Sequence, residues 1–407
     1  MIGANANTNF TKGFHAANGH TAIPQRLFSV STAPSLEEFK KLSQDSTTIH
    51  YPLATSIEKN IPIYHLPSYS TLSTAQISAL QDEWNHILLS GPGVFVTKCL
   101  YTDLSLLDNV NIAFSDIIAQ EKSSQAPKGD HFAGSGQNDR IWNSFSKHCL
   151  QDPSSFLAYY SNPWLEAISS SWLGPHHRLT AQVNIVKPGA KPQISHRDYH
   201  LGFQTAESCA QFPKHLQIAS QFLTLQGAVA HSDMPIESGP TRLLPFSQKF
   251  PDGYMAYRLQ EFSDYFLTRY VSLPLAKGDG LFFNPALFHA AGQNDSSSIE
   301  RSANLLQISA AFGKPMETID TLPLIAATWD GLVEKYIKEG LSKEVRTFVG
   351  NVAEGYPFPT NLDRRVPQTA GMAPESEQEV LIRALEKGLD RDKVLGDLRG
   401  MRDDEKA

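Results

Sequence analysis

Residues 193–204 of the chain read QISHRDYHLGFQ and contain an H-x-D pair, His196 and Asp198. The pair follows the turn-forming residues KPGAKP, and we expect it to lie on a strand. Because side chains alternate along a strand, His196 and Asp198 would point to one side and Arg197 to the other. Two histidines and one carboxylate hold a ferrous ion and leave coordination positions open. The pair therefore predicts two ligands of such a site, and a third must come from another strand.

The predicted third ligand is His289, within GDGLFFNPALFHAAGQN (278–294). It ends an apolar run that predicts a central strand, and a buried imidazole in that position needs a partner. A histidine in a strand is more often a structural residue than a metal ligand, so this alternative stays open for His289 at this point.

A second H-x-D pair, His231 and Asp233, competes with the first. It ends an apolar run and enters SDMPIESGP, which predicts a surface turn. The first pair follows a Pro/Gly turn and is expected to lead into a further strand, so we favour His196 and Asp198. His200 is predicted to face the substrate or to support the ligands.

The charge balance disfavours a nucleic-acid-binding protein. Lysine and arginine total 35, aspartate and glutamate total 42, and the net charge is −7; a nucleic-acid binder normally carries a basic patch. The three cysteines are far apart and form no C-x-x-C, which argues against a disulfide framework or a thiolate zinc site. No apolar stretch is typical of a signal peptide or a membrane span. We therefore expect a cytoplasmic protein with no membrane partner.

The chain divides into three predicted parts: an irregular N-terminal arm (1–60), a single catalytic domain (61–350), and a Pro-rich connector with a C-terminal helical extension (351–407). A helix is predicted from the capping box of Ser73 and Gln76 to the SGPG that follows it. Further helices are predicted within 104–121, 316–350 and 377–400, and a strand over 93–100. The last helix has an apolar stripe that is expected to dock on the body or on another subunit, as in a homodimer.

Many short apolar runs separated by turn residues follow from about residue 155. This pattern of short apolar runs and turns predicts a β-sandwich or barrel. The runs cover 177–189, 217–231, 241–247, 270–292 and 302–313.

Four blocks occur in one order: QISHRD (193–198), ESGPTRLLPFSQK (237–249), KGDGLFFNPALFHAAGQN (277–294) and ERSANLLQIS (300–309). Over about residues 80–315 the chain resembles the phytanoyl-CoA dioxygenase family of Fe(II)/2-oxoglutarate-dependent oxygenases, and particularly its fungal members that tailor natural products. The resemblance implies a mainly β fold with flanking helices around a double-stranded β-helix, the cupin-like jelly roll. It also implies that His196, Asp198 and His289 bind Fe(II).

Four more positions match the family's cosubstrate pocket. The resemblance implies that Arg301 pairs with the far carboxylate of 2-oxoglutarate, a role that suits a guanidinium fork. It implies that Gln193, Thr241 and Arg140 lie around the same molecule. The alternatives are a salt bridge at the barrel edge for Arg301 and structural roles for the other three. The chain departs from the family at Gln226, where an aromatic residue is common, and in an inserted loop (205–217).

The resemblance implies an enzyme that uses Fe(II), 2-oxoglutarate and O2 to oxidise a small organic substrate, releasing succinate and CO2. A secondary-metabolite intermediate is the expected substrate. Because family halogenases lack the carboxylate ligand, Asp198 favours hydroxylation, desaturation or rearrangement. The rival hypotheses are a metal-binding cupin-like protein that does not use 2-oxoglutarate and a non-catalytic member of the fold.

Overall fold

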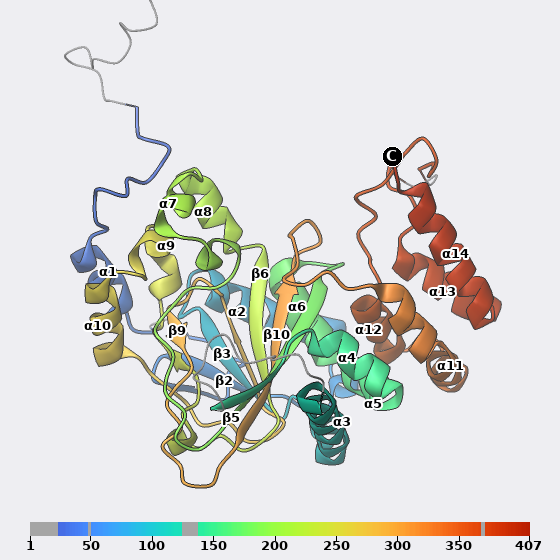
Figure 1. Cartoon of the computed structure of the whole chain (residues 1–407), viewed down its shortest axis with the longest axis horizontal. Helices are drawn as coiled ribbons and strands as arrows, with labels where there is room; N and C mark the ends of the chain where they lie inside the picture. Colours follow the sequence, from blue (N-terminus) through green and yellow to red (C-terminus); the bar gives the residue numbers. More distant parts are fainter. Residues whose placement is uncertain (1–22, 48–49, 124–136, 368–370) are drawn as a thin grey trace, which may run out of the picture.

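The computed structural model of the chain describes residues 23–47, 50–123, 137–367 and 371–407. Its centre is an eight-stranded sheet in the order β1-β2-β3-β8-β6-β10-β5-β4, in which only β2 and β3 run parallel (Figure 1). A two-stranded sheet, β7-β9, accompanies it. The strands are β1 (Ser56–Glu58), β2 (Ile61–His65), β3 (Val94–Lys98), β4 (Asn138–Ile141), β5 (Arg178–Val186), β6 (Thr224–Ala230), β7 (Arg242–Leu243), β8 (Gly280–Phe283), β9 (His289–Ala290) and β10 (Arg301–Ser309).

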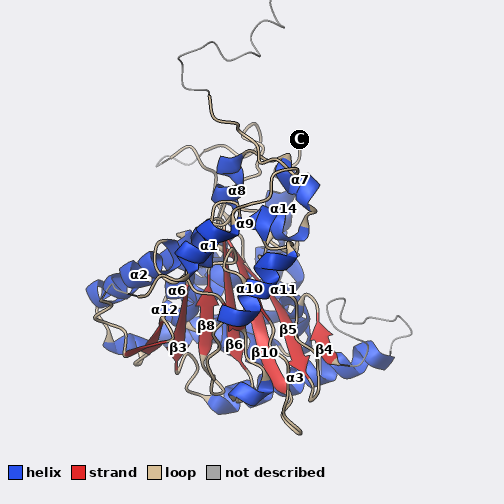
Figure 2. Cartoon of the chain, turned by 90° about the vertical axis from the view of Figure 1, so that its left-hand side faces the viewer, coloured by secondary structure: helices blue, strands red, loops and turns tan. Residues whose placement is uncertain are grey.

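Helices cover one face of the large sheet and extend beyond it (Figure 2). Among helices α2 to α6, α2 contacts β3, α4 contacts β5 and α6 contacts β6 directly. Helices α11 to α14 pack on the outer side of this layer. Figure 1 shows α1 and α7 to α10 on the opposite side from α11 to α14. The helices are α1 (Leu36–Ser43), α2 (Thr74–Leu89), α3 (Leu104–Ser123), α4 (Ser144–Gln151), α5 (Pro153–Tyr160), α6 (Pro163–Leu173), α7 (Ala206–Ala210), α8 (Lys214–Ser220), α9 (Gly253–Ala256), α10 (Gln260–Arg269), α11 (Thr321–Glu339), α12 (Lys343–Val352), α13 (Glu377–Lys387) and α14 (Arg391–Asp404).

The central strands are buried on both faces, and alternation decides what each face carries. On β10, Leu306 and Ile308 join the hydrophobic core under the helices, whereas Arg301 and Gln307 line a cavity on the other face. β5 and β6 divide their side chains in the same way. The large sheet therefore separates a hydrophobic core from a polar cavity.

Several predicted elements are confirmed. Ser73 and Gln76 form the capping box of α2, α3 begins at Leu104 as expected, and β3 lies within the predicted strand. The predicted helical regions 316–350 and 377–400 each contain two helices, α11–α12 and α13–α14. The apolar stripe of the last region is buried against this chain's own core, so it does not support the predicted homodimer.

The expected mainly β composition was wrong, because many more of the described residues lie in helices than in strands. The inserted segment is not a loop: it forms α7 and α8, and the predicted strand at 217–231 begins only with β6. Inside the arm expected to be irregular lie α1 and β1, while residues 1–22 fall outside the described part. The division into parts and the jelly-roll topology stay predictions. Among the described helices, none is both long and apolar enough to cross a membrane.

His231 directly follows the end of β6, as its sequence context predicted, and its side chain is buried. Its Nδ1 donates to Asn111 Oδ1 at 2.8 Å, and its Nε2 accepts from the Tyr159 hydroxyl at 3.0 Å. Burial lowers the pKa of His231 to about 3 and the pKa of nearby His148 to about 4. The unfolded chain, with ordinary histidine pKa values, therefore takes up protons first as the pH falls. Stability present above about pH 6.5 is lost progressively below it.

We expect His231→Gln to make the protein less sensitive to acid, although it lowers the free energy of unfolding at pH 7.5. Removing one such imidazole reduces the slope of that free energy against pH by up to about 1.4 kcal/mol per unit below pH 6.5. Urea unfolding followed by circular dichroism at several pH values measures the slope. The control is His215→Gln on the exposed side of α8, which should keep the wild-type slope. Equal slopes for all three proteins would contradict the assignment to His231.

Candidate functional site

A backbone pairing brings together two histidines that are far apart in sequence. The His196 N–H donates to the His289 carbonyl at 2.9 Å, and the His289 N–H donates to the His196 carbonyl at 3.1 Å. Their ring centroids lie 4.4 Å apart. The prediction of a central strand at His289 was wrong. His289 belongs to β9 of the small sheet. The apolar run before His289 forms two strands, β8 and β9, and not one. Pro285 lies between them and has no N–H to continue the hydrogen-bond ladder of the sheet.

Both imidazoles are held in one tautomer. Nδ1 of His196 donates to the Ile194 carbonyl at 2.9 Å, and Nδ1 of His289 donates to the Leu287 carbonyl at 2.8 Å. Because a carbonyl only accepts, Nδ1 carries the proton and Nε2 keeps its lone pair. Each ring is thereby fixed with Nε2 as the atom available to a metal.

Asp198 completes a cluster of three ligand atoms that lie within 4.8 Å of one another. Its carboxylate is 3.4 Å from His289 Nε2 and 3.8 Å from His196 Nε2. Burial raises the pKa of Asp198, but the two imidazoles and the Gln226 amide outweigh burial and lower it below its ordinary value. Burial and the neighbouring His289 lower the pKa of His196. Two neutral imidazoles and one ionised carboxylate are a donor set that suits Fe(II).

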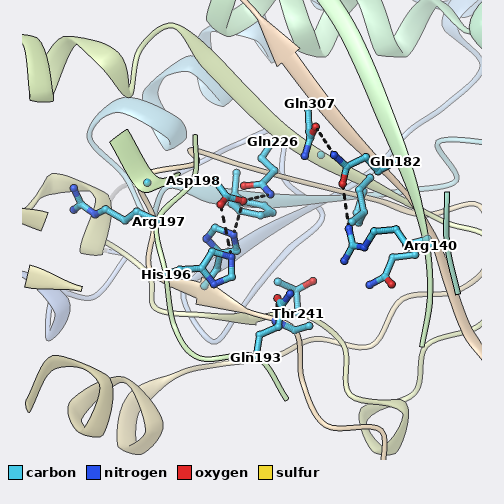
Figure 3. A pocket seen from close by; sticks show the side chains of 18 of the residues that line it. Arg140, Gln182, Gln193, His196, Arg197, Asp198, Gln226, Thr241 and Gln307 are labelled. Carbon is cyan, nitrogen blue, oxygen red and sulfur yellow. Dashed lines mark hydrogen bonds and ion pairs between the residues drawn. The ribbon is translucent and has the colours of Figure 1, made fainter. Parts of the chain in front are cut away.

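Arg197 joins the segment of His196 and Asp198 to a neighbouring loop. The pair does not lie on the expected strand, because only His196 forms an isolated β-bridge. Figure 3 shows the Arg197 side chain directed away from His196 and Asp198, and it is buried. Its guanidinium donates to the carbonyls of Ser247 and Phe250 at 2.6 and 3.0 Å. Gly253 leaves room for it, since a Cβ there would lie 1.8 Å from Arg197 Cζ. The segment between the two ligands is therefore tied to the loop before α9.

The chain after Asp198 does not form the expected strand but a short 3-10 helix, η3 (His200–Phe203). Nε2 of His200 bonds to the Lys314 carbonyl at 2.9 Å, and His200 does not line the cavity that contains the cluster. The second pair, His231 and Asp233, is also absent from the one metal-ligand cluster found in the described part of the chain.

The three ligands open into a cavity of about 540 Å³, which we call the central cavity. Arg301, at the start of β10, lines it and is only 6% exposed. No described carboxylate pairs with Arg301, and its Nη1 has no hydrogen-bond partner there. Burial lowers its pKa to about 10, so it stays charged at neutral pH. A buried cation without a partner is costly, and an anionic ligand in the cavity would remove that cost.

The other three predicted residues line the same cavity. Gln193 Oε1 accepts from the Ala291 N–H at 3.1 Å, which leaves its amide nitrogen as a donor. Thr241 is partly buried beside it (Figure 3). Nη1 of Arg140 donates to Gln182 Oε1 at 3.1 Å, and its guanidinium lies 5.0 Å from the Trp142 ring centroid.

Sequence reasoning gave no site role to three glutamines of the cavity wall. Gln226 donates to the Asp198 carboxylate at 2.9 Å, and Gln182 donates to Gln307 at 3.3 Å (Figure 3). The available signal was the presence of amide side chains within the apolar strands β5, β6 and β10. At an alternate position, such a residue indicates a polar inner face.

Comparisons with known proteins give a family match. The family model described as phytanoyl-CoA dioxygenase (PhyH) matches residues 73–303, which is more than half of the chain. A curated protein, dioxygenase trt7 of Aspergillus terreus (strain NIH 2624 / FGSC A1156), is 25% identical over 226 residues, which is 56% of this chain and 66% of the relative. The chain thus spans just under two thirds of that relative's length.

Two solved structures from nogalamycin biosynthesis are also similar. The non-heme alpha ketoglutarate dependent epimerase SnoN has 17% identity and a TM-score of 0.39, covering 59% of this chain and 84% of its own. The carbocyclase SnoK has 16% identity and a TM-score of 0.41, covering 61% and 95%. These scores are too low to support an inference about this chain.

The family match itself contains His196, Asp198, His289 and Arg301. Because the family model matches more than half of the chain, the chain belongs to the phytanoyl-CoA dioxygenase family.

Proposed function

We propose that this chain is an Fe(II)/2-oxoglutarate-dependent dioxygenase that oxidises a small organic substrate and releases succinate and CO2. One observation carries the proposal: three metal-ligand atoms within 4.8 Å of one another share a cavity with a buried arginine that no carboxylate of residues 23–47, 50–123, 137–367 or 371–407 pairs with. A site with metal ligands alone would not require the arginine. Together they fit a ferrous ion and a dicarboxylate.

Each residue has a distinct task in this proposal. His196, Asp198 and His289 hold Fe(II), which supplies, with 2-oxoglutarate and O2, the oxidising power for the substrate. Arg301 binds the far carboxylate of 2-oxoglutarate through a charge-assisted fork. Gln193, Thr241 and Arg140 offer further polar contacts to the cosubstrate. Apolar residues such as Phe283 and Leu275 also line the cavity, and an environment that excludes water strengthens such an ion pair.

The substrate is expected to be a small molecule, because a cavity of about 540 Å³ lies in the usual range for such ligands. A secondary-metabolite intermediate is our proposal for its class. The retained Asp198 fits hydroxylation, desaturation or rearrangement. A metal-binding protein that does not use 2-oxoglutarate is the alternative, and the two experiments below separate it from the proposed function.

Asp198→Ala should reduce succinate formation from 2-oxoglutarate at least about 100-fold, since losing even an outer partner of a metal ligand costs 10- to 100-fold. The matched control is Asp233→Ala, which removes the exposed aspartate of the second H-x-D pair and should leave the rate unchanged. Wild-type protein treated with a chelator should lose the activity and regain it with Fe(II). An Asp198→Ala protein with the wild-type rate would contradict the metal site.

Arg301→Met should raise the 2-oxoglutarate concentration for half-saturation about 100-fold, because two charge-assisted hydrogen bonds are worth about 3 kcal/mol. Anaerobic titration of the Fe(II) protein, followed by the visible charge-transfer absorption of the chelated keto acid, measures this. Arg242→Met, which removes an arginine of β7 that packs on Tyr270, is the control. Binding of 2-oxoglutarate that is indifferent to Arg301, or absent from the wild-type iron protein, would favour the alternative.

A further inference from the structure

The carboxylate of Asp198 has one partner that is not a candidate metal ligand. Nε2 of Gln226 donates to Asp198 Oδ2 at 2.9 Å. The two histidines of the cluster also lie within 4 Å of this carboxylate. Gln226 therefore reaches the site through its amide nitrogen, which donates a hydrogen bond and is not a metal ligand.

The two partners come from parts of the fold that differ in rigidity. Gln226 lies in the middle of β6, which pairs with β8 on one side and β10 on the other. Asp198 lies outside any strand, and its backbone makes two separate hydrogen bonds. Its N–H donates to the Pro285 carbonyl, and its own carbonyl accepts from the Tyr254 hydroxyl. The hydrogen bond from Gln226 is what ties the side chain of Asp198 to the large sheet.

The chemistry sets the direction of this bond. A carboxylate only accepts, so the NH2 group of Gln226 must face Asp198. The bond holds the carboxylate against rotation about its last side-chain torsion, which is otherwise soft. A ligand oriented before the metal arrives loses less freedom on binding it, and partners of this kind typically strengthen metal binding 10- to 100-fold.

We propose that Gln226 is a positioning residue that orients Asp198 for the metal. The inference rests on the proposed metal site, but it concerns how tightly that site binds rather than which reaction it performs. Its consequence is that the amide of β6 helps to set the metal affinity of the protein before any cosubstrate is present.

The test compares Gln226→Met, which keeps the length of the side chain and loses the donor, with the wild-type protein. Competition against a chromophoric chelator under anaerobic conditions gives the Kd for Fe(II), and Co(II) gives a visible spectrum of the ligand field. We expect the Fe(II) Kd to rise 10- to 100-fold and the Co(II) spectrum to change. Gln226→Asn, which withdraws the amide by about 1.5 Å, should behave like Gln226→Met.

The matched control is Gln307→Met. Gln307 pairs directly with Gln226 across β10 and β6 and also lines the central cavity, but its hydrogen bond goes to Gln182. Its loss should leave the Fe(II) Kd within about twofold of wild type. Thermal unfolding of the metal-free proteins checks that each variant folds.

The outcomes separate this inference from the proposed function. If both Gln226 variants bind Fe(II) as tightly as wild type, Gln226 has no positioning role and the proposed function stands. If Gln307→Met weakens binding equally, the effect belongs to the cavity wall in general and the inference is overturned. If the wild-type protein binds neither Fe(II) nor Co(II), both proposals fail together.

Discussion

The exchange of two backbone hydrogen bonds between His196 and His289 is the constraint on which the site depends. A pair of residues that exchanges both bonds has a fixed separation and direction. Both rings therefore project to the same side, and carbonyls two residues earlier fix their tautomers. Asp198 follows two residues later in the same segment, and Gln226 donates a hydrogen bond to its carboxylate. A slip of this pairing by one residue would turn one imidazole to the opposite face.

Two buried arginines near the site illustrate how the same residue type serves structure and function. Arg197 and Arg301 both have pKa values lowered to about 10 by burial. Nη2 of Arg197 donates to carbonyls of the chain itself, so the folded protein supplies partners for this guanidinium. Arg301 faces the central cavity without a carboxylate partner in the described residues. Their different partners, and not their burial, distinguish Arg197, which anchors the motif, from Arg301, which we propose binds the cosubstrate.

The large sheet supports the site by having two different faces. Core residues such as Leu306 pack under the helices, while Gln226 and Gln307 stand on adjacent strands in the cavity. The helices that cover the core face make up much of the chain. The chain therefore has more helix than strand, although many short apolar runs predicted strands. The apolar segments between 145 and 173, such as that of α6, belong to the helices that cover the core face.

By itself, the sequence determined the ligand types, the order of the blocks, and the capping box at Ser73, because these depend on residues close together in the chain. It also indicated Arg301 through the family resemblance. Only the tertiary structure decided that His289 pairs with His196 in a small sheet, that His231 is buried away from the cluster, and that Gln226 holds Asp198. These contacts join segments distant in sequence, and their geometry follows from strand pairing and packing, which local patterns do not specify.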